Sequence, residues 1–308
     1  MKLHPHLLAA ALAAAVLPAA TACAGSRPLI VAHRGGTADF PENTLLAIRG
    51  SLANRAQAMW LSVQLSADGV PVLYRPQDLS ALTQAQGPVS QYTAAQLAGF
   101  NAGHQFRDPD PNAAVPYPYR ERPQPVPSLD SALQLIGARV PVILDLKTAP
   151  DPALVDAVAA VLERRRAWAY TQFYSTEAGF EPMLARHPKA RRFETRDATR
   201  GRLLQVALEQ RCEPPPAPVW SAFELRRRLD VSETFTLGQG LTGIANAALW
   251  TPQAVACFRQ RSPAVGLLAI GVNSSDDYRR AAMLGMDAVL VDSPAAARQW
   301  TILPARRP

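Results

Sequence analysis

Apolar and polar positions along the chain form a repeating pattern of short apolar runs and longer amphipathic segments. The short runs predict strands, and apolar residues spaced three or four apart predict helices. The expected strands cover residues 28–32, 60–65, 70–74, 140–146, 170–174, 218–223, 265–270 and 288–291. The expected helices begin near residue 44 and cover residues 128–136, 152–168, 181–186 and 275–284.

This alternation predicts parallel strands joined by right-handed helical crossovers. Two α/β architectures share the pattern: the doubly wound open sheet and the (β/α)8 TIM-type barrel. A dinucleotide-binding sheet has a glycine-rich loop after its first strand, whereas this chain has His33-Arg34-Gly35-Gly36 there. We therefore expect a single-domain barrel with its site at the C-terminal ends of the strands.

One long segment interrupts the alternation after the third strand. The second and third strands are joined by a turn that ends in Asp68-Gly69, a strong hairpin signal. Residues 77–127 are then rich in Pro, Gln, Asn and Gly, with one short helix expected near residues 93–97. We expect this segment to be a loop excursion from the barrel that carries function or shapes its mouth.

Residues 1–24 have the layout of a secretory signal, with a basic start, an apolar run in residues 7–17 and small residues before Gly25. The apolar run is shorter than the roughly 20 residues that cross a bilayer. Cleavage after Ala22 would leave Cys23 as a lipid-modified first residue, and cleavage in an Ala-x-Ala pattern fits equally well. We expect an exported protein, either in the bacterial periplasm or anchored to a membrane as a lipoprotein, with the barrel in residues 25–308.

Charge and cysteine content change this interpretation little. The formal net charge is +7, but the arginines form short scattered clusters without interleaved aromatic residues, so we expect a solvated basic surface and no nucleic-acid partner. In an oxidising compartment Cys212 and Cys257 can form a disulfide if the fold brings them together, and two buried thiols are the equal alternative.

Two motifs near the first strand carry the most specific signal. His33-Arg34-Gly35 ends the strand and Pro41-Glu42-Asn43-Thr44 opens the first helix. Together they resemble the opening motif of glycerophosphodiester phosphodiesterases. The resemblance continues through Asp68-Gly69-Val70-Pro71-Val72, Asp78-Leu79, Gly87-Pro88-Val89, Val126-Pro127-Ser128-Leu129, Leu144-Asp145-Leu146-Lys147, Gly285-Met286-Asp287-Ala288 and Val291-Asp292-Ser293-Pro294.

The resemblance implies an activity and a set of residue roles. Enzymes of this family hydrolyse phosphodiesters with two histidines as acid and base and with Ca²⁺ or Mg²⁺, which a Glu-x-Asp pair and a later glutamate hold. By this resemblance His33 is the first catalytic histidine and Arg34 faces the phosphate, while Glu42 and Asn43 order the loop. A cation on the nonbridging oxygens and a proton donor for the leaving alkoxide lower the barrier.

Four functional positions depart from the family pattern. Trp60 and Ser62 stand where the Glu-x-Asp metal pair is expected, and Arg75-Pro76 replaces the second histidine and its following aspartate. Only Asp145 remains in place of the later ligand, and one carboxylate is a poor site for a cation that prefers six or more oxygens. The indole of Trp60 is expected to fill the volume of the missing ion.

These departures lead to two hypotheses. The first is a phosphoric diester hydrolase with impaired or altered catalysis, in which Asp145 holds any remaining metal and His104, Glu177, Glu194 or Glu224 supplies a lost group. The second is an exported pseudoenzyme that binds a phosphorylated headgroup or an anionic partner. Its anion clamp would consist of Arg34, Arg75 and Lys147, and it would associate with a membrane only if Cys23 carries a lipid.

Overall fold

The structure is a computed structural model that describes residues 27–216 and 219–301. The predicted signal segment and its candidate lipidation residue Cys23 lie outside the described residues. None of the helices in the described ranges is long and apolar enough to cross a membrane.

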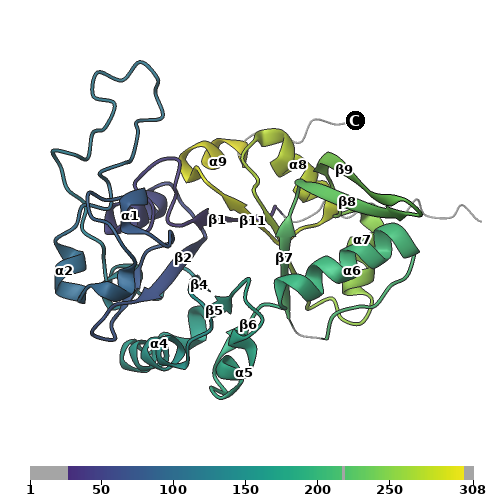
Figure 1. Cartoon of the computed structure of the whole chain (residues 1–308), viewed down its shortest axis with the longest axis horizontal. Helices are drawn as coiled ribbons and strands as arrows, with labels where there is room; N and C mark the ends of the chain where they lie inside the picture. The colour runs from purple at the N-terminus through teal and green to yellow at the C-terminus, as the bar shows by residue number, and fades with distance from the viewer. Residues whose placement is uncertain (1–26, 217–218, 302–308) are drawn as a thin grey trace, which may run out of the picture.

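Eight parallel strands form a nearly closed barrel, which confirms the predicted fold class (Figure 1). Their order is β6-β5-β4-β2-β1-β11-β10-β7. A single parallel bridge between Phe193 and Trp220 brings the two end strands together. The strands are β1 (Leu29–His33), β2 (Ala58–Leu65), β4 (Val142–Leu146), β5 (Thr171–Tyr174), β6 (Arg191–Arg192), β7 (Trp220–Glu224), β10 (Gly266–Ile270) and β11 (Ala288–Val291).

Helices surround the barrel, as Figure 1 shows in a view along it. Most of them begin at a Ser, Thr or Asp whose side chain accepts a backbone N–H of the first turn, for example Thr44 before α1 and Ser128 before α3. The α-helices are α1 (Leu45–Ala53), α3 (Leu129–Ile136), α4 (Pro152–Arg165), α5 (Phe180–Ala185), α6 (Arg196–Glu209), α7 (Pro252–Arg259), α8 (Ser275–Leu284) and α9 (Pro294–Trp300), and a short 3-10 helix, η3 (Trp168–Tyr170), precedes β5.

The predicted excursion after the third strand is present. The strand β3 (Pro71–Leu73) pairs antiparallel with β2 and is therefore not part of the parallel barrel. Residues 77–127 then carry the short helices η1 (Leu79–Ala81), η2 (Val89–Gln91) and α2 (Ala94–Ala98). The excursion has its own apolar cluster, which includes Tyr74, Leu79 and Leu97. This cluster holds the segment in a fixed shape beside the barrel.

Aromatic side chains pack together in one part of the barrel interior, beside aliphatic residues such as Ile143 and Leu268. Trp60 of β2 lies with its ring centroid 4.6 Å from that of Tyr174 and 6.0 Å from that of Phe193. Phe193 in turn lies 5.9 Å from Trp220 by ring centroids. Burial of such large rings contributes strongly to stability. Trp60 is thus an interior packing residue as well as a residue of the site.

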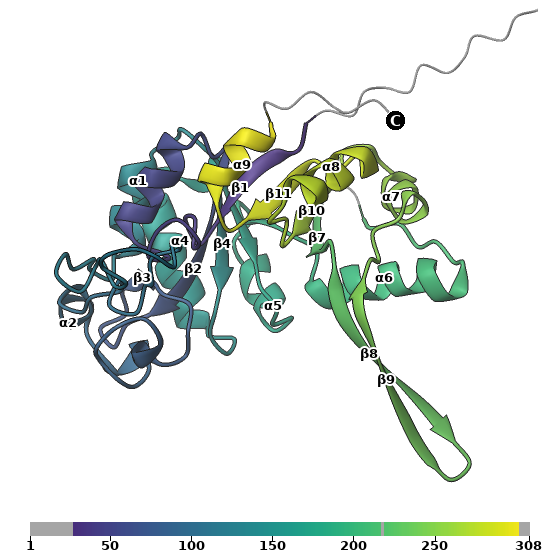
Figure 2. The same cartoon turned by 90° about the horizontal axis from the view of Figure 1, so that it is seen from above.

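A second antiparallel hairpin, which the sequence pattern did not predict, follows β7. Its strands are β8 (Arg227–Phe235) and β9 (Gly238–Ala247). Figure 2 shows this ribbon projecting from the body of the molecule. The strands carry mostly polar, charged or glycine residues, so they lack the continuous apolar run that marks the buried strands of the barrel.

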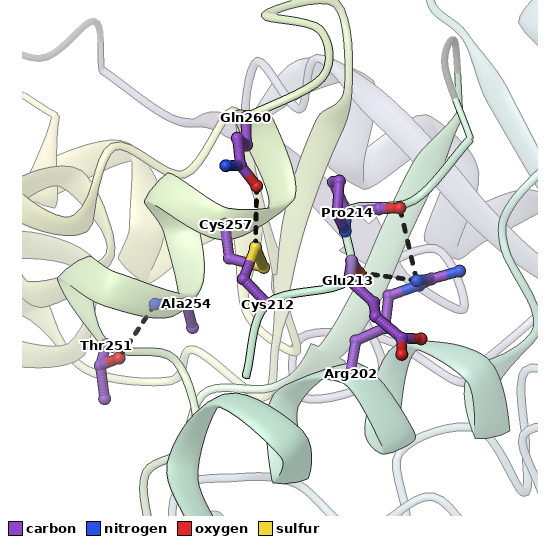
Figure 3. The surroundings of a disulfide bond; sticks show 8 residues. All are labelled: Arg202, Cys212, Glu213, Pro214, Thr251, Ala254, Cys257 and Gln260. Carbon is purple, nitrogen blue, oxygen red and sulfur yellow. Dashed lines mark hydrogen bonds between the residues drawn. A yellow bond between two sulfur atoms is a disulfide. The ribbon is translucent and has the colours of Figure 1, made fainter. Parts of the chain in front are cut away.

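The two cysteines in the described ranges form a disulfide and are not separate buried thiols. Cys212, which follows α6, forms a disulfide with Cys257 of α7, and their Cα atoms are 5.6 Å apart (Figure 3). The bond closes a loop that contains β7 and the β8–β9 hairpin. It therefore ties the last third of the barrel to the preceding helix.

Candidate functional site

His33 stands at the end of β1 and belongs to a short chain of hydrogen bonds. Its Nδ1 lies 2.6 Å from Oδ1 of Asp292, which directly follows β11. The other carboxylate oxygen of Asp292 accepts a hydrogen bond of 2.6 Å from Nδ2 of Asn273. The hydrogen bond from His33 lowers the pKa of Asp292, although partial burial acts in the opposite direction. The carboxylate fixes the ring, so Nε2 is the nitrogen left for other partners.

Arg34 lies next to the imidazole. Its Nε donates to Nε2 of His33 over 3.2 Å, and its guanidinium forms an ion pair with Glu42. Arg34 has a φ of +50°. After it, Gly36 has a φ of +96°, and a Cβ atom there would lie 2.7 Å from Oγ of Ser51. The turn therefore requires glycine, and it aims the Arg34 side chain back over the strand end.

Asn43 connects this turn to β2. Its backbone N–H donates to the carbonyl of Arg34 over 2.7 Å, and its side-chain oxygen accepts the backbone N–H of Ser62 over 3.0 Å. Glu42 and Asn43 are both buried, and Glu42 also accepts a hydrogen bond from Thr37. These contacts hold the loop after β1 against the end of β2.

Asp145 of β4 is surrounded by hydrogen-bond donors. Its Oδ2 accepts the indole N–H of Trp60 over 3.0 Å and lies 3.2 Å from Nζ of Lys147. Burial raises the pKa of the Asp145 carboxyl, while the Lys147 ammonium and the Trp60 hydrogen bond oppose this shift. Trp60 is only 2% exposed. One carboxylate is thus matched by one ammonium group in a largely buried setting.

Five of these residues, His33, Arg34, Trp60, Asp145 and Lys147, line a cavity of about 520 Å³ at the C-terminal ends of the strands. His33 and Trp60 are register partners on the adjacent strands β1 and β2. The lining carries more cations than anions. The cations are Arg34, Arg75, Lys147, Arg196 and Arg227, and the carboxylates are Asp145, Asp197 and Glu224. The structure thus brings together all three residues of the predicted anion clamp.

Comparison with known proteins places this geometry in a family. The model of the glycerophosphoryl diester phosphodiesterase family matches residues 33–177. Uncharacterized protein Rv2277c of Mycobacterium tuberculosis is 47% identical over 89% of each chain. The crystal structure of its glycerophosphoryl diester phosphodiesterase domain, at 45% identity, superposes with a TM-score of 0.83 and covers 90% of this chain and 100% of that one. The chain belongs to the glycerophosphoryl diester phosphodiesterase family.

Other members of the family agree in fold at lower identity. A glycerophosphodiester phosphodiesterase from Agrobacterium tumefaciens superposes with a TM-score of 0.63 at 21% identity, covering 88% of this chain and 99% of that one. Glycerophosphodiester phosphodiesterase 1 from Bos taurus is 39% identical over 28% of this chain and 27% of its own. The barrel is therefore common to this chain and the two solved structures, and a shared barrel does not by itself establish a shared activity.

The residues around Asp145 do not fit the divalent metal ion of the family. In residues 27–216 and 219–301 no three His, Cys, Asp or Glu side chains are grouped to hold a metal ion. Buried oxygen atoms without a hydrogen-bond partner do occur there, on Glu42, Ser62 and Asp145. However, Arg34 neutralises Glu42 and Lys147 neutralises Asp145. Calcium and magnesium prefer six or more oxygen ligands, and both carboxylates here are already paired with a cation.

The far wall of the cavity was not predicted from the sequence. Nη2 of Arg196, at the start of α6, donates to both carboxylate oxygens of Glu224 over 2.6 and 2.7 Å. Arg227, the first residue of β8, contacts the same carboxylate at 2.8 Å. The Arg196 guanidinium also lies over the ring of Phe223, 4.8 Å from its centroid. Glu224, one of the suggested replacement ligands, is thus already paired with two arginines.

The other candidate residues lie elsewhere or have structural contacts. Glu194 accepts from Arg202 over 2.6 Å and is not part of the cavity lining. Glu177 lines an adjoining hollow of about 970 Å³, which shares Arg75 and Lys147 with the cavity. The lining does not include His104, which lies in the excursion. The backbone carbonyl of Pro76 accepts a hydrogen bond from Gln64 and so orders the chain beside Arg75.

Proposed function

We propose that the mouth of the barrel binds a phosphodiester group through guanidinium and ammonium groups in place of a divalent metal ion. The observation that carries the proposal is the cavity lining, which places Arg34, Arg75 and Lys147 beside His33. Arginine and lysine form strong charge-assisted hydrogen bonds to phosphate oxygens. The neutralised carboxylates described above support the same view, because they leave no net negative charge for a cation.

Arg75 is the clearest candidate for a first contact with the ligand. Its side chain has no carboxylate within 4 Å and no hydrogen bond among the residues that the structure describes. It is exposed at the junction of the cavity and the adjoining hollow. A phosphodiester held there could place one ester substituent on each side. A phosphodiesterase from Oleispira antarctica, with 20% identity, was solved in complex with the product sn-glycerol-3-phosphate, so a barrel of the same fold accommodates a glycerol phosphate group.

Binding without efficient hydrolysis agrees with the acid–base groups. Hydrolysis needs a proton donor for the leaving alkoxide. The position of the second histidine holds Arg75, and a guanidinium does not release its proton at neutral pH. In this proposal the barrel recognises a phosphorylated headgroup or glycerophosphodiester and releases it unchanged.

A second candidate function is slow hydrolysis without a metal ion. The pair of His33 and Asp292 favours it, because a carboxylate on Nδ1 is the arrangement that makes the opposite ring nitrogen an effective base. In that case Nε2 exchanges its contact with Arg34 for the attacking hydroxyl, accepts its proton as the new P–O bond forms, and returns that proton to the alkoxide whose P–O bond breaks.

The test measures binding and turnover separately in the presence of EDTA. Calorimetry with glycerophosphoglycerol is expected to show binding in EDTA, reduced about 10- to 100-fold by Lys147→Met, which removes one charge-assisted hydrogen bond. Lys189→Met is the matched control, because Lys189 pairs with Glu163 on the exposed surface. Binding that requires added Ca²⁺ would refute the metal-free clamp.

Release of glycerol phosphate, followed in the same samples, decides between the two functions. Turnover in EDTA that His33→Ala abolishes would establish the metal-independent hydrolase. Binding without turnover at any Ca²⁺ concentration would establish the binding protein.

We also propose that the protein is exported and folds in an oxidising compartment. The signal-like residues 1–24 and the Cys212–Cys257 disulfide support this location. A disulfide across 45 residues is expected to add about 4 kcal/mol to the free energy of unfolding in the chain-entropy description. Mass spectrometry of protein from the cell envelope, with and without reduction, tests whether the bond forms there.

A further inference from the structure

The β8–β9 hairpin, residues 227–247, is hereafter called the arm. It leaves the end of β7 at the rim of the cavity, where its first residue Arg227 forms part of the lining. At its base Leu229 packs against the apolar core outside the barrel. Beyond this point the ribbon extends away from the body (Figure 2), and within the described ranges its two strands form a sheet of their own.

Exposed apolar side chains follow the arm from its base to its turn. Ile244, opposite Leu229 near the base, is 45% exposed, and Val231 and Leu241 near the middle are 42% and 79% exposed. Phe235 and Leu237 at the turn are 59% and 100% exposed. An isolated two-stranded ribbon is at best marginally stable in water. A projecting ribbon with an apolar end is typical of a surface that another molecule covers.

The two edges of the arm differ in charge. All of its ionisable side chains lie on β8: Arg227, Arg228, Asp230 and Glu233. The sequence of β9, Gly-Gln-Gly-Leu-Thr-Gly-Ile-Ala-Asn-Ala, has none. Charged side chains protect an edge strand against pairing with another chain, and an uncharged edge invites it. The open edge is therefore that of β9.

The backbone of β9 is accessible for such pairing. Three of its ten residues are glycines, which leave room for the close approach of another backbone. Phe235 and Gly238 pair across the two-residue turn, and hydrogen-bonded pairs alternate with non-hydrogen-bonded pairs from there. The N–H and C=O groups of Gln239, Leu241 and Gly243 consequently point to the open edge.

We propose that a second copy of this chain covers the arm, with the β9 edges of the two copies paired antiparallel about a two-fold axis. A two-fold axis makes the interface isologous, so one unprotected edge is sufficient for both partners. The ten residues of β9 span about 33 Å, which also places the end of each arm against the barrel of its partner. Phe235 and Leu237 at the turn are the apolar residues that would be covered there.

The proposed dimer needs two contacts to bury enough surface: the paired β9 edges and the arm ends on the partner. Pairing of two strand edges about 33 Å long and about 10 Å deep buries only about 700 Å² in total. A stable interface needs about 1,200 Å² or more. Covering Phe235, Leu237 and Leu241 of each arm adds about 100 Å² for each side chain. Together they exceed the threshold, whereas the edge alone does not.

Sedimentation velocity of the purified full chain over about 1–100 μM tests the proposal. Wild type is expected to sediment as a dimer. Leu241→Lys, which charges the open edge, and Leu237→Asp, which charges the end of the arm, are each expected to weaken dimerisation at least about tenfold. Met283→Lys is the matched control, because Met283 is an equally exposed apolar residue on α8, away from the arm, and should leave the dimer intact.

Hydrogen exchange reports on the edge itself. The amides of Gln239, Leu241 and Gly243 are expected to be protected in the dimer and to exchange freely in Leu241→Lys. Leu241 and Leu237 are exposed in the monomer. The monomeric form of each variant should therefore melt at the same temperature as monomeric wild type. A wild type that stays monomeric at about 100 μM, or a dimer that survives both substitutions, would overturn the proposal. A monomer that binds phosphatidylglycerol vesicles through Leu237 would assign the arm to a membrane instead.

Discussion

The two sides of the cavity hold their charges in different ways. On the side of β1 and β11, His33, Asp292 and Asn273 form a partly exposed chain of hydrogen bonds. On the side of β2 and β4, Asp145 is 4% exposed and is held between the Trp60 indole and the Lys147 ammonium. The first side can exchange a proton with a ligand. The second is a packed ion pair next to aromatic side chains of the barrel interior.

This difference bears on the proposed function. A histidine oriented by a carboxylate needs no metal ion to hold its geometry. On the adjacent side, a buried carboxylate is costly unless donors satisfy it, and the Trp60 N–H satisfies one oxygen of Asp145. In the proposed function the side of β2 and β4 contributes stability and positive charge, and the side of β1 supplies a group that can exchange a proton.

The largest effect that separates the sides is expected for Trp60→Ala. Truncation of this buried indole should lower the free energy of unfolding by about 3–5 kcal/mol. It leaves a cavity and removes a hydrogen-bond donor from the Asp145 carboxylate. His33→Ala, on the partly exposed side, should cost about 1 kcal/mol or less. Urea unfolding measures both, and Trp60→Phe separates loss of the hydrogen bond from loss of the volume. Equal costs for the two alanine variants would remove the distinction between the sides.

Asp145→Asn is expected to strengthen ligand binding. The amide keeps an acceptor for the Trp60 N–H and frees the Lys147 ammonium for the phosphate, so affinity for a phosphodiester should rise about tenfold. In the wild type the same gain should develop as the pH falls toward the raised pKa of Asp145. Calorimetry in EDTA measures this change. A loss of affinity in Asp145→Asn in EDTA would refute this role of Lys147, and a loss seen only with added Ca²⁺ would instead identify Asp145 as a ligand to a metal ion.

Seven of the eight barrel strands are predicted from the sequence, because each is buried and appears as a continuous apolar run. The strand β6 was not predicted, because it consists of Arg191 and Arg192, and the expected strand over residues 70–74 is the antiparallel β3. The β8–β9 hairpin was missed, because an exposed glycine-rich ribbon has no such run. The same limit applies to the site. The segments around His33 and Lys147 can be found from local motifs. The ion pair between Arg196 and Glu224 cannot, because these residues are 28 positions apart in sequence and meet only when the barrel closes. Asp292 lies 259 residues from His33, and only the parallel pairing of β1 with β11 brings them together.

Asp292→Asn tests how the hydrogen bond between His33 and Asp292 on the β1 side contributes to the pH dependence of stability. The pKa of Asp292 is lowered from its ordinary value of 3.8, mainly by the hydrogen bond from His33. Its contribution is therefore complete above about pH 4 and is lost as the pH falls through the lower folded-state value. After allowance for solvent screening this amounts to about 1 kcal/mol. Acid unfolding curves should show that loss in the wild type and not in Asp292→Asn.

The smallest effect is expected for Arg75→Gln. Arg75 is exposed, so its contact with a phosphate is screened by salt, and its removal should weaken binding only about threefold at physiological ionic strength. At low salt the loss of affinity in Arg75→Gln should be larger, because the contact that Arg75 makes with the phosphate is electrostatic. Calorimetric titrations at two salt concentrations measure this dependence, with Arg164→Gln as the control on an exposed arginine that pairs with Asp130 away from the cavity. If Arg75→Gln abolished binding at every salt concentration, Arg75 would be the central phosphate ligand. The cation that binds phosphate on the β2 side would then be the exposed Arg75 guanidinium and not the Lys147 ammonium.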